Sequence, residues 1–185
     1  MKPIGEVLRA TLVSLEHSTP EYIHAQLLRD AAKGLLFFNL EVETSTDGTP
    51  TKDANWLDMT HALTFAQALR SVCERYPEFW NLGLLQMAMF NARNRKFINP
   101  EQDFELKTAS KDSFKEFIPS IIDHGYSHPI FSCHYLKTFF AVREEYEKSS
   151  DAELQSYLFA ALKRFMRSRI KEKHNLRAIH QALLL

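Results

Sequence analysis

Histidines with aromatic neighbours are the side chains of this chain that could do chemistry. His61 lies in the stretch NWLDMTHALTFAQALRSVCERYPEFW, and His124, His128 and His134 lie in DHGYSHPIFSCHYLKTFFAVREEYEK. Imidazole can bind a metal, hydrogen-bond a ligand or carry a proton near neutral pH. A histidine among aromatic residues needs a partner, because an unpaired polar group is costly to bury. We therefore expect any functional site to lie in these two stretches.

The turn before Pro129 gives the stronger of the two candidates. It places His128 at the start of an expected helix, with the polar side chains of the sequence DHGYS just before it. Helix starts offer free N–H groups and positive potential, which favour anions and oxyanions. We predict His128 as an acid–base or oxyanion-binding catalytic residue, with ligand contacts from His124, Tyr126, His134 and Tyr135. The alternative is that His128 only caps the helix.

His61 is the second predicted catalytic residue. We expect its ring to act either as a ligand or as the group that orients a neighbouring side chain. It falls on one stripe at helical spacing with Leu57, Phe65, Ala68 and Val72, and this stripe is expected to face the core. Phe65 is then a predicted ligand contact. The pocket we expect is lined by aromatic residues of both stretches: Phe65, Phe131, Tyr135 and Phe139. The alternative is a core histidine bonded to a backbone carbonyl or to a neighbouring side chain.

Metal binding is a further alternative that the spacing leaves open. Asp58 and His61, three residues apart, could share a metal or fix the ring. Glu21 and His24 form the Glu-x-x-His half of a di-iron helix motif, but no second Glu-x-x-His occurs. The sequence identifies neither a particular metal nor a cofactor. The two cysteines, Cys73 and Cys133, do not suggest a disulfide framework.

Composition excludes several function classes. The 185 residues carry 23 basic and 23 acidic side chains, 45% of the residues are hydrophobic, and only 5 are glycine. Scarce glycine disfavours a many-stranded β fold, and no apolar run is long enough to span a membrane. Residues 163–177 are strongly basic, but the balanced total charge and the lack of a binding motif disfavour nucleic acid as a partner. The charged N-terminal stretch is not typical of a signal peptide, so we expect a cytoplasmic protein.

The helices that must position these residues follow from periodicity and from capping residues. The sequence predicts one all-helical domain over residues 1–185, a bundle of about seven helices. Thr19-Pro20-Glu21 is a helix start, and Ser150 to Glu153 fits a capping box. The apolar stretch 82–90 is expected at the centre of the core. The expected helices cover residues 3–17, 20–41, 56–76, 78–95, 110–123, 128–148 and 151–174, and a continuation of the last to residue 183 is left open.

Three short segments resemble the C-terminal part of questin oxidase-like proteins. They are MTHALTF over residues 59–65, SHPI over residues 127–130 and AVREE over residues 141–145. The resemblance implies an oxygenase that acts on polycyclic aromatic ketones with a reduced nicotinamide cofactor, and it carries over His61 and His128. The long N-terminal half of those proteins has no counterpart in this sequence. A site completed by dimerisation and a scaffold without the chemistry are both compatible with that difference.

These patterns lead to one main hypothesis and two alternatives. The main one is a small helical protein with a histidine- and aromatic-lined pocket for an apolar or aromatic ligand, either oxidoreductase-like or purely ligand-binding. The first alternative is a non-catalytic assembly subunit, a homo-oligomer that uses Phe79, Trp80, Phe139 and Phe140 as a dimer face. The second is a metal-binding helical bundle.

Overall fold

The protein is all-helical, as predicted. The computed structural model describes residues 3–44, 54–107, 109–122, 129–168 and 182–183. Within these residues there are eight α-helices and no strand; Phe38 and Ile98 form an isolated bridge. The helices are α1 (Ile4–His17), α2 (Pro20–Leu36), α3 (Leu40–Thr44), α4 (Trp56–Cys73), α5 (Trp80–Asn94), α6 (Ile118–Ile122), α7 (Pro129–Lys148) and α8 (Ala152–Arg167), with short 3-10 helices at Pro77–Phe79, Arg95–Phe97 and Lys111–Phe117.

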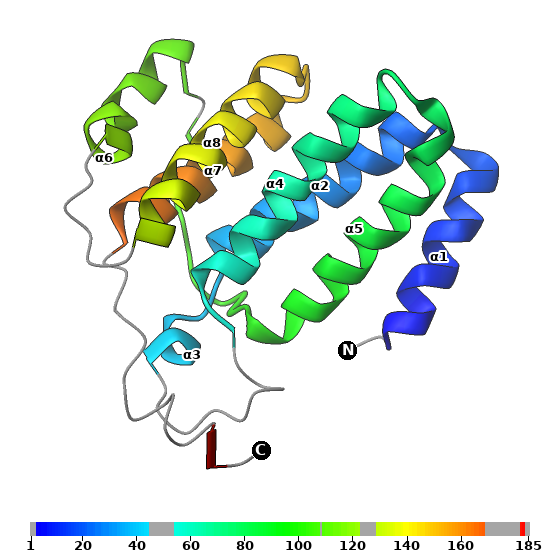
Figure 1. Cartoon of the computed structure of the whole chain (residues 1–185), viewed down its shortest axis with the longest axis horizontal. Helices are drawn as coiled ribbons and strands as arrows, with labels where there is room; N and C mark the ends of the chain where they lie inside the picture. The colour runs from blue at the N-terminus through cyan, green and yellow to red at the C-terminus, as the bar shows by residue number, and fades with distance from the viewer. Residues whose placement is uncertain (1–2, 45–53, 108, 123–128, 169–181, 184–185) are drawn as a thin grey trace.

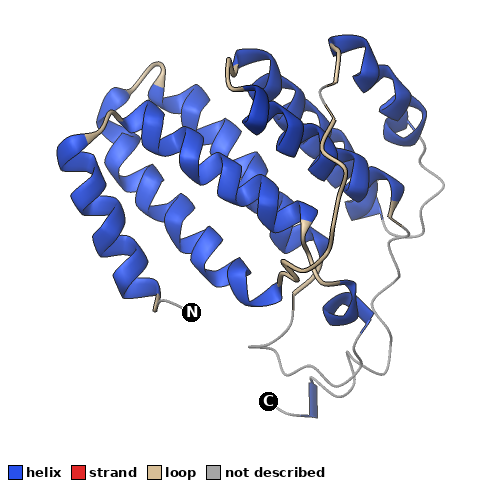
Figure 2. Cartoon of the chain, turned by 180° about the vertical axis from the view of Figure 1, so that it is seen from behind, coloured by secondary structure: helices blue, strands red, loops and turns tan. Residues whose placement is uncertain are grey.

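Helix α2 lies at the centre of the arrangement and contacts α4, α5 and α8 (Figure 1). Helix α7 packs against α4 on one side and α8 on the other, whereas α1 covers the outer side of α5. Seen from behind, the described residues are helices joined by loops, and no strand is drawn among them (Figure 2). One cluster of buried apolar side chains extends through α2, α4, α5, α7 and α8. The two long histidine-bearing helices, α4 and α7, are therefore direct neighbours.

Local capping explains where the main helices begin. The Thr19 hydroxyl accepts a hydrogen bond from the Tyr22 N–H at 3.3 Å, which confirms the predicted start of α2. Asn55 and Asp58 form a reciprocal capping box at the start of α4. Helix α8 begins one residue later than its predicted box implies, because Asp151 rather than Ser150 accepts the Leu154 N–H.

Several predicted boundaries were wrong in detail. Residues 20–41 are not one helix, because α2 ends at Leu36 and α3 begins separately at Leu40. Helix α4 ends at Cys73 rather than at residue 76. Most of the helix predicted over 110–123 is a 3-10 segment, Lys111–Phe117, with α6 after it. The predicted extension of the last helix beyond residue 168 lies almost wholly outside the described residues, as does most of the loop predicted after residue 43.

The packing of α4 and α5 also corrects two expectations. The core face of α4 carries Trp56, Met59, Leu63 and Ala66, so it is rotated from the predicted stripe, whose later members Ala68 and Val72 are exposed. Helix α5 is not buried all round, since Leu84 and Met87 face the core while Leu82 is 70% exposed. The number of apolar residues in a helix indicates how much of its surface is buried. The packing of the neighbouring helices decides which side of the helix that is.

Candidate functional site

Two of the predicted site histidines meet where α4 packs against α7. The Nε2 atoms of His61 and His134 lie 3.0 Å apart, within hydrogen-bond distance. His61 comes from the second turn of α4 and is half-buried; His134 comes from the second turn of α7 and is 7% exposed. The two rings are tilted by 57° with their centroids 5.1 Å apart. The pairing joins residues 73 positions apart in the sequence.

A backbone carbonyl fixes the tautomers of the pair. Nδ1 of His134 lies 2.7 Å from the Ile130 carbonyl oxygen, which can only accept, so this nitrogen carries the proton. In the neutral ring Nε2 of His134 is then an acceptor, and Nε2 of His61 donates to it. The remaining nitrogen, Nδ1 of His61, is therefore a basic acceptor, and it bonds to no group in the described part of the chain.

Burial and a nearby ammonium group keep both rings neutral. Desolvation lowers the pKa of His61 and of His134, and the positive charge of Lys137 lowers the pKa of each further. The hydrogen bond to Ile130 offsets part of this effect for His134. Desolvation also lowers the pKa of Lys137 itself. At neutral pH the pair thus presents one basic nitrogen beside a positive potential.

Asp58 does not bond to His61, although the two are three residues apart. Its carboxylate oxygens accept the Asn55 N–H at 3.0 Å and a guanidinium N–H of Arg93 at 2.8 Å. Asp58 reaches His61 only through its charge, which raises the pKa of that ring. It therefore caps α4 and anchors Arg93, and it is not the orienting group that the spacing suggested.

The other predicted site residues fall into two groups. His124, Tyr126 and His128 lie outside the described residues, so their predicted roles stay predictions. Phe65 is half-buried against Phe90, with ring centroids 5.6 Å apart. Tyr135 is a core residue, 1% exposed and 5.0 Å from the Phe165 ring by centroids. Ligand contact by Phe65, His134 and Tyr135 also stays a prediction.

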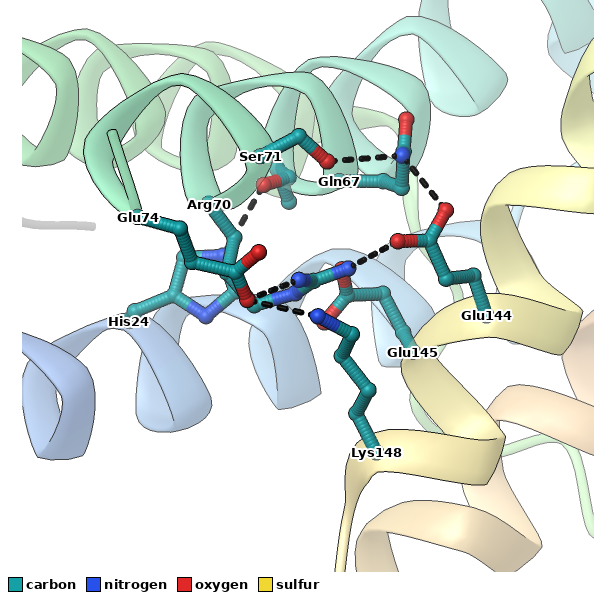
Figure 3. Close-up of polar contacts among 9 residues, drawn as sticks. His24, Gln67, Arg70, Ser71, Glu74, Glu144, Glu145 and Lys148 are labelled. Atoms are coloured by element: carbon teal, nitrogen blue, oxygen red, sulfur yellow. Dashed lines mark hydrogen bonds and ion pairs between the residues drawn. The ribbon is translucent and has the colours of Figure 1, made fainter. Parts of the chain in front are cut away.

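A second polar cluster joins the other ends of α4 and α7 (Figure 3). Arg70 of α4 donates from Nε to Glu145 and from Nη2 to Glu144, both at 2.7 Å, and it also pairs with Glu74. Lys148 completes the cluster with a 2.6 Å contact to Glu74. The side chains of Arg70 and Glu145 are only 11% and 5% exposed. This cluster, which we call the Arg70 clamp, fixes α4 against α7.

The electrostatics of the Arg70 clamp favour a structural role. Burial would lower the pKa of Arg70, but its hydrogen bonds with Glu144 and Glu145 outweigh burial and raise it. Burial raises the pKa of Glu145, and the charge of Arg70 offsets only part of that rise. The hydrogen bond from Arg70 lowers the pKa of Glu144. Each of the three guanidinium nitrogens thus has a carboxylate partner, which is the arrangement expected of a group that holds two helices together.

His24 lies beside the Arg70 clamp and is not part of a di-iron site in the described residues. Its Nε2 donates to the Ala66 carbonyl at 2.9 Å, and its ring packs edge-on against Trp80. Burial lowers the pKa of His24, so the ring is neutral at physiological pH. The described ranges contain no group of three or more His, Cys, Asp or Glu side chains that could hold a metal. His24 is thus a core histidine bonded to a backbone carbonyl, the role that was the alternative for His61.

Sequence reasoning missed Lys137, Arg70 and Glu145. Lys137 lies three residues after His134, so helical spacing could have placed it on the same face. In the sequence, Glu145 is conspicuous only as the last residue of the AVREE segment. Its burial depends on Arg70, 75 residues away, and no local pattern reveals that partner. Both cysteines are free; Cys73 is buried and Cys133 is exposed.

Among the described helices, none combines the length and the apolar character that a bilayer span requires. No protein-family model, no curated protein and no solved structure matches the chain.

Proposed function

We propose that this chain is a small helical ligand-binding protein with oxidoreductase-like acid–base chemistry centred on His61 and His134. The observation that carries the proposal is the 3.0 Å contact between their Nε2 atoms. With its own Nδ1 bonded to the Ile130 carbonyl, His134 accepts from His61 and leaves Nδ1 of His61 as the base. An imidazolium formed on His61 would be stabilised by donating to His134, as a positioned partner stabilises the histidine of a catalytic triad.

The ligand we propose is an aromatic ketone with an acidic hydroxyl group. Nδ1 of His61 would accept the hydroxyl proton, and the positive charge of Lys137 would favour the resulting oxyanion. Phe65, one turn after His61 on α4, is half-buried and offers an apolar surface to the ring system. This ligand class agrees with the polycyclic ketones that the resemblance to questin oxidase-like proteins implies.

A hydroxyanthraquinone is a suitable probe, because its phenolate absorbs at longer wavelength than its phenol. We expect the wild-type protein to bind it and to lower its apparent pKa by about one unit or more, as a nearby positive charge does. His61→Gln should keep binding but lose most of this shift, and Lys137→Gln should lose part of it. His17→Gln is the matched control, because His17 is exposed on α1. An unshifted probe in the wild-type protein would overturn the proposal.

Metal binding is a second candidate, because two Nε2 atoms converge on one point. Two nitrogen ligands of a tetrahedral zinc ion lie about 3.3 Å apart, close to the 3.0 Å found here. Binding would require the loss of the shared proton. Calorimetry with zinc alone at pH near 7.5 should then show stoichiometric uptake with proton release, absent in His61→Gln and in His134→Gln. Uptake that survives both substitutions rules this candidate out.

A cytoplasmic location and a homo-oligomeric state are also part of the proposal. Both cysteines are free thiols, and Cys133 is exposed, which suits a reducing compartment. The dimer face first expected does not form as a surface, because Trp80 and Phe139 are buried. Of those four aromatic residues, Phe79 and Phe140 are about half-exposed, so a dimer would have to use these two. Light scattering of the purified chain measures the oligomeric state directly.

A further inference from the structure

A cavity of about 430 Å³ lies beside α8, in a different part of the fold from the His61–His134 pair. Its apolar wall is formed by the end of α2, the middle of α8 and the segment before Lys107: Leu36, Phe104, Phe159 and Ala160. The volume falls within the range of small-molecule sites, which are mostly apolar with a few placed polar groups. The cavity is therefore large enough for an organic ligand rather than for water alone.

The polar lining of this cavity is strongly cationic. Lys107, Lys163, Arg164 and Arg167 line it, and Glu105 is the carboxylate among its lining residues. Lys107 pairs with Glu105 at 3.0 Å, and Arg167 pairs with Glu116 at 2.6 Å. Lys163 has no ion pair or hydrogen bond within the described chain. The lining thus holds more positive charge than its own carboxylates neutralise.

Among these cations, Arg164 is the one whose unneutralised positive charge is most costly to keep in the protein. Its guanidinium donates to the carbonyls of Leu36 and Phe38 and stacks over the Phe104 ring, 4.7 Å from the centroid. Burial lowers the pKa of Arg164 to about 10, and no carboxylate of the described residues opposes the shift. A buried charge is ordinarily paired with an opposite one. The two carbonyls satisfy hydrogen bonds but carry no net charge, so within the described part of the chain Arg164 has no anionic partner.

We propose that this cavity binds an organic carboxylate with an apolar body. The apolar wall of Phe104, Phe159 and Leu36 would hold the body, and the ammonium group of Lys163 would pair with the carboxylate while Arg164 and Arg167 add positive potential. Nucleic acid is the weaker alternative, because the cations here line a concave, partly aromatic cavity and the whole chain carries no net charge. The chain's own segment 169–181 is also poorly complementary, since it carries four basic residues against one glutamate.

Decanoate and its neutral analogue decanol are the probes. Calorimetry at low ionic strength should show that the full-length protein binds decanoate about tenfold or more tightly than decanol, and that added salt reduces this preference. Lys163→Glu should abolish the preference. Lys115→Glu is the matched control, because Lys115 is an exposed lysine whose ion pair is with Asp112, and it should behave as wild type.

Ala160→Phe tests the cavity itself, because a larger side chain in the wall fills the space that the apolar body would occupy. It should weaken decanoate and decanol alike, while circular dichroism shows an unchanged helical content. Equal binding of the two probes, or decanoate binding that Lys163→Glu leaves unchanged, would overturn the proposal. It would also be overturned if a short single-stranded oligonucleotide bound in a Lys163-dependent way and decanoate did not.

Discussion

Replacing Arg70 by methionine should destabilise the protein far more than the loss of an ordinary ion pair. The substitution keeps the apolar stem and removes the guanidinium that Glu145 contacts at 2.7 Å. Glu145 is 5% exposed at its side chain, so water compensates little for the loss of this partner. Glu144 and Glu74 lose the same guanidinium, but their side chains are 42% and 50% exposed and stay hydrated. The cost therefore arises mainly at Glu145.

The expected magnitude follows from that burial. Leaving one partner of a buried ion pair uncompensated costs about 3–5 kcal/mol, whereas an exposed pair contributes roughly 0–1 kcal/mol. Arg95→Met is the matched control, because Arg95 pairs with Asp30 and both side chains are more than 40% exposed. The double variant Arg70→Met/Glu145→Gln should recover part of the loss, since it removes the stranded charge.

Urea unfolding followed by far-ultraviolet circular dichroism measures these differences, with equal m-values as the check on two-state behaviour. The loss caused by Arg70→Met should shrink toward pH 4.5, a value near the ordinary carboxyl pKa. Burial already raises the pKa of Glu145, and removing Arg70 raises it further, so this group protonates and its penalty disappears. If Arg70→Met were within about 1 kcal/mol of Arg95→Met at pH 7, the view of Glu145 as a charge that depends on Arg70 would be wrong.

Three further outcomes are expected. Burial lowers the pKa of His24, so the unfolded chain binds the proton more readily and the free energy of unfolding should fall as pH drops from about 7.5 to 5.5; urea titrations of His24→Gln should show a weaker dependence. Leu84→Ala should cost about 2–5 kcal/mol of unfolding free energy, because Leu84 is fully buried, while Leu82→Ala at a 70% exposed position of the same helix should lie within about 0.5 kcal/mol of wild type; equal losses would contradict the packing of α5. Cys133 should react with a thiol reagent at a rate near that of a free thiol and Cys73 only on unfolding, since Cys73 is buried with a raised pKa; two fast thiols in the native protein would show that the α4 core opens readily.

The helices themselves could be read from the sequence because their signals are local. The Thr19 hydroxyl accepts an N–H from the first turn of α2, and Pro20 is the first residue of that helix. Both signals are local, so the start of α2 was predicted to the residue. Boundaries failed where tertiary contacts intervene. The chain bends after Leu36, where the Phe37 carbonyl accepts the Asn99 N–H and the Asn39 N–H binds the Phe97 carbonyl. Those bonds come from a segment about sixty residues away, which helical periodicity cannot include.

The candidate site, like the helices, could be predicted only in part from the sequence. The sequence alone indicated that His61 and His134 lie near the beginnings of two aromatic-rich helices, because residue type and spacing are written in the chain. Only the tertiary structure decided that their Nε2 atoms meet, that Lys137 shares their environment and that Arg70 has Glu145 as its partner. The physical reason is that hydrophobic periodicity does not specify how far a helix is rotated about its own axis. A small rotation of α4 is compatible with the same residue spacing, but it moves His61 from the core face to the contact with α7. The rotation of α4 is decided by how the side chains of both helices pack and form polar pairs where α4 contacts α7.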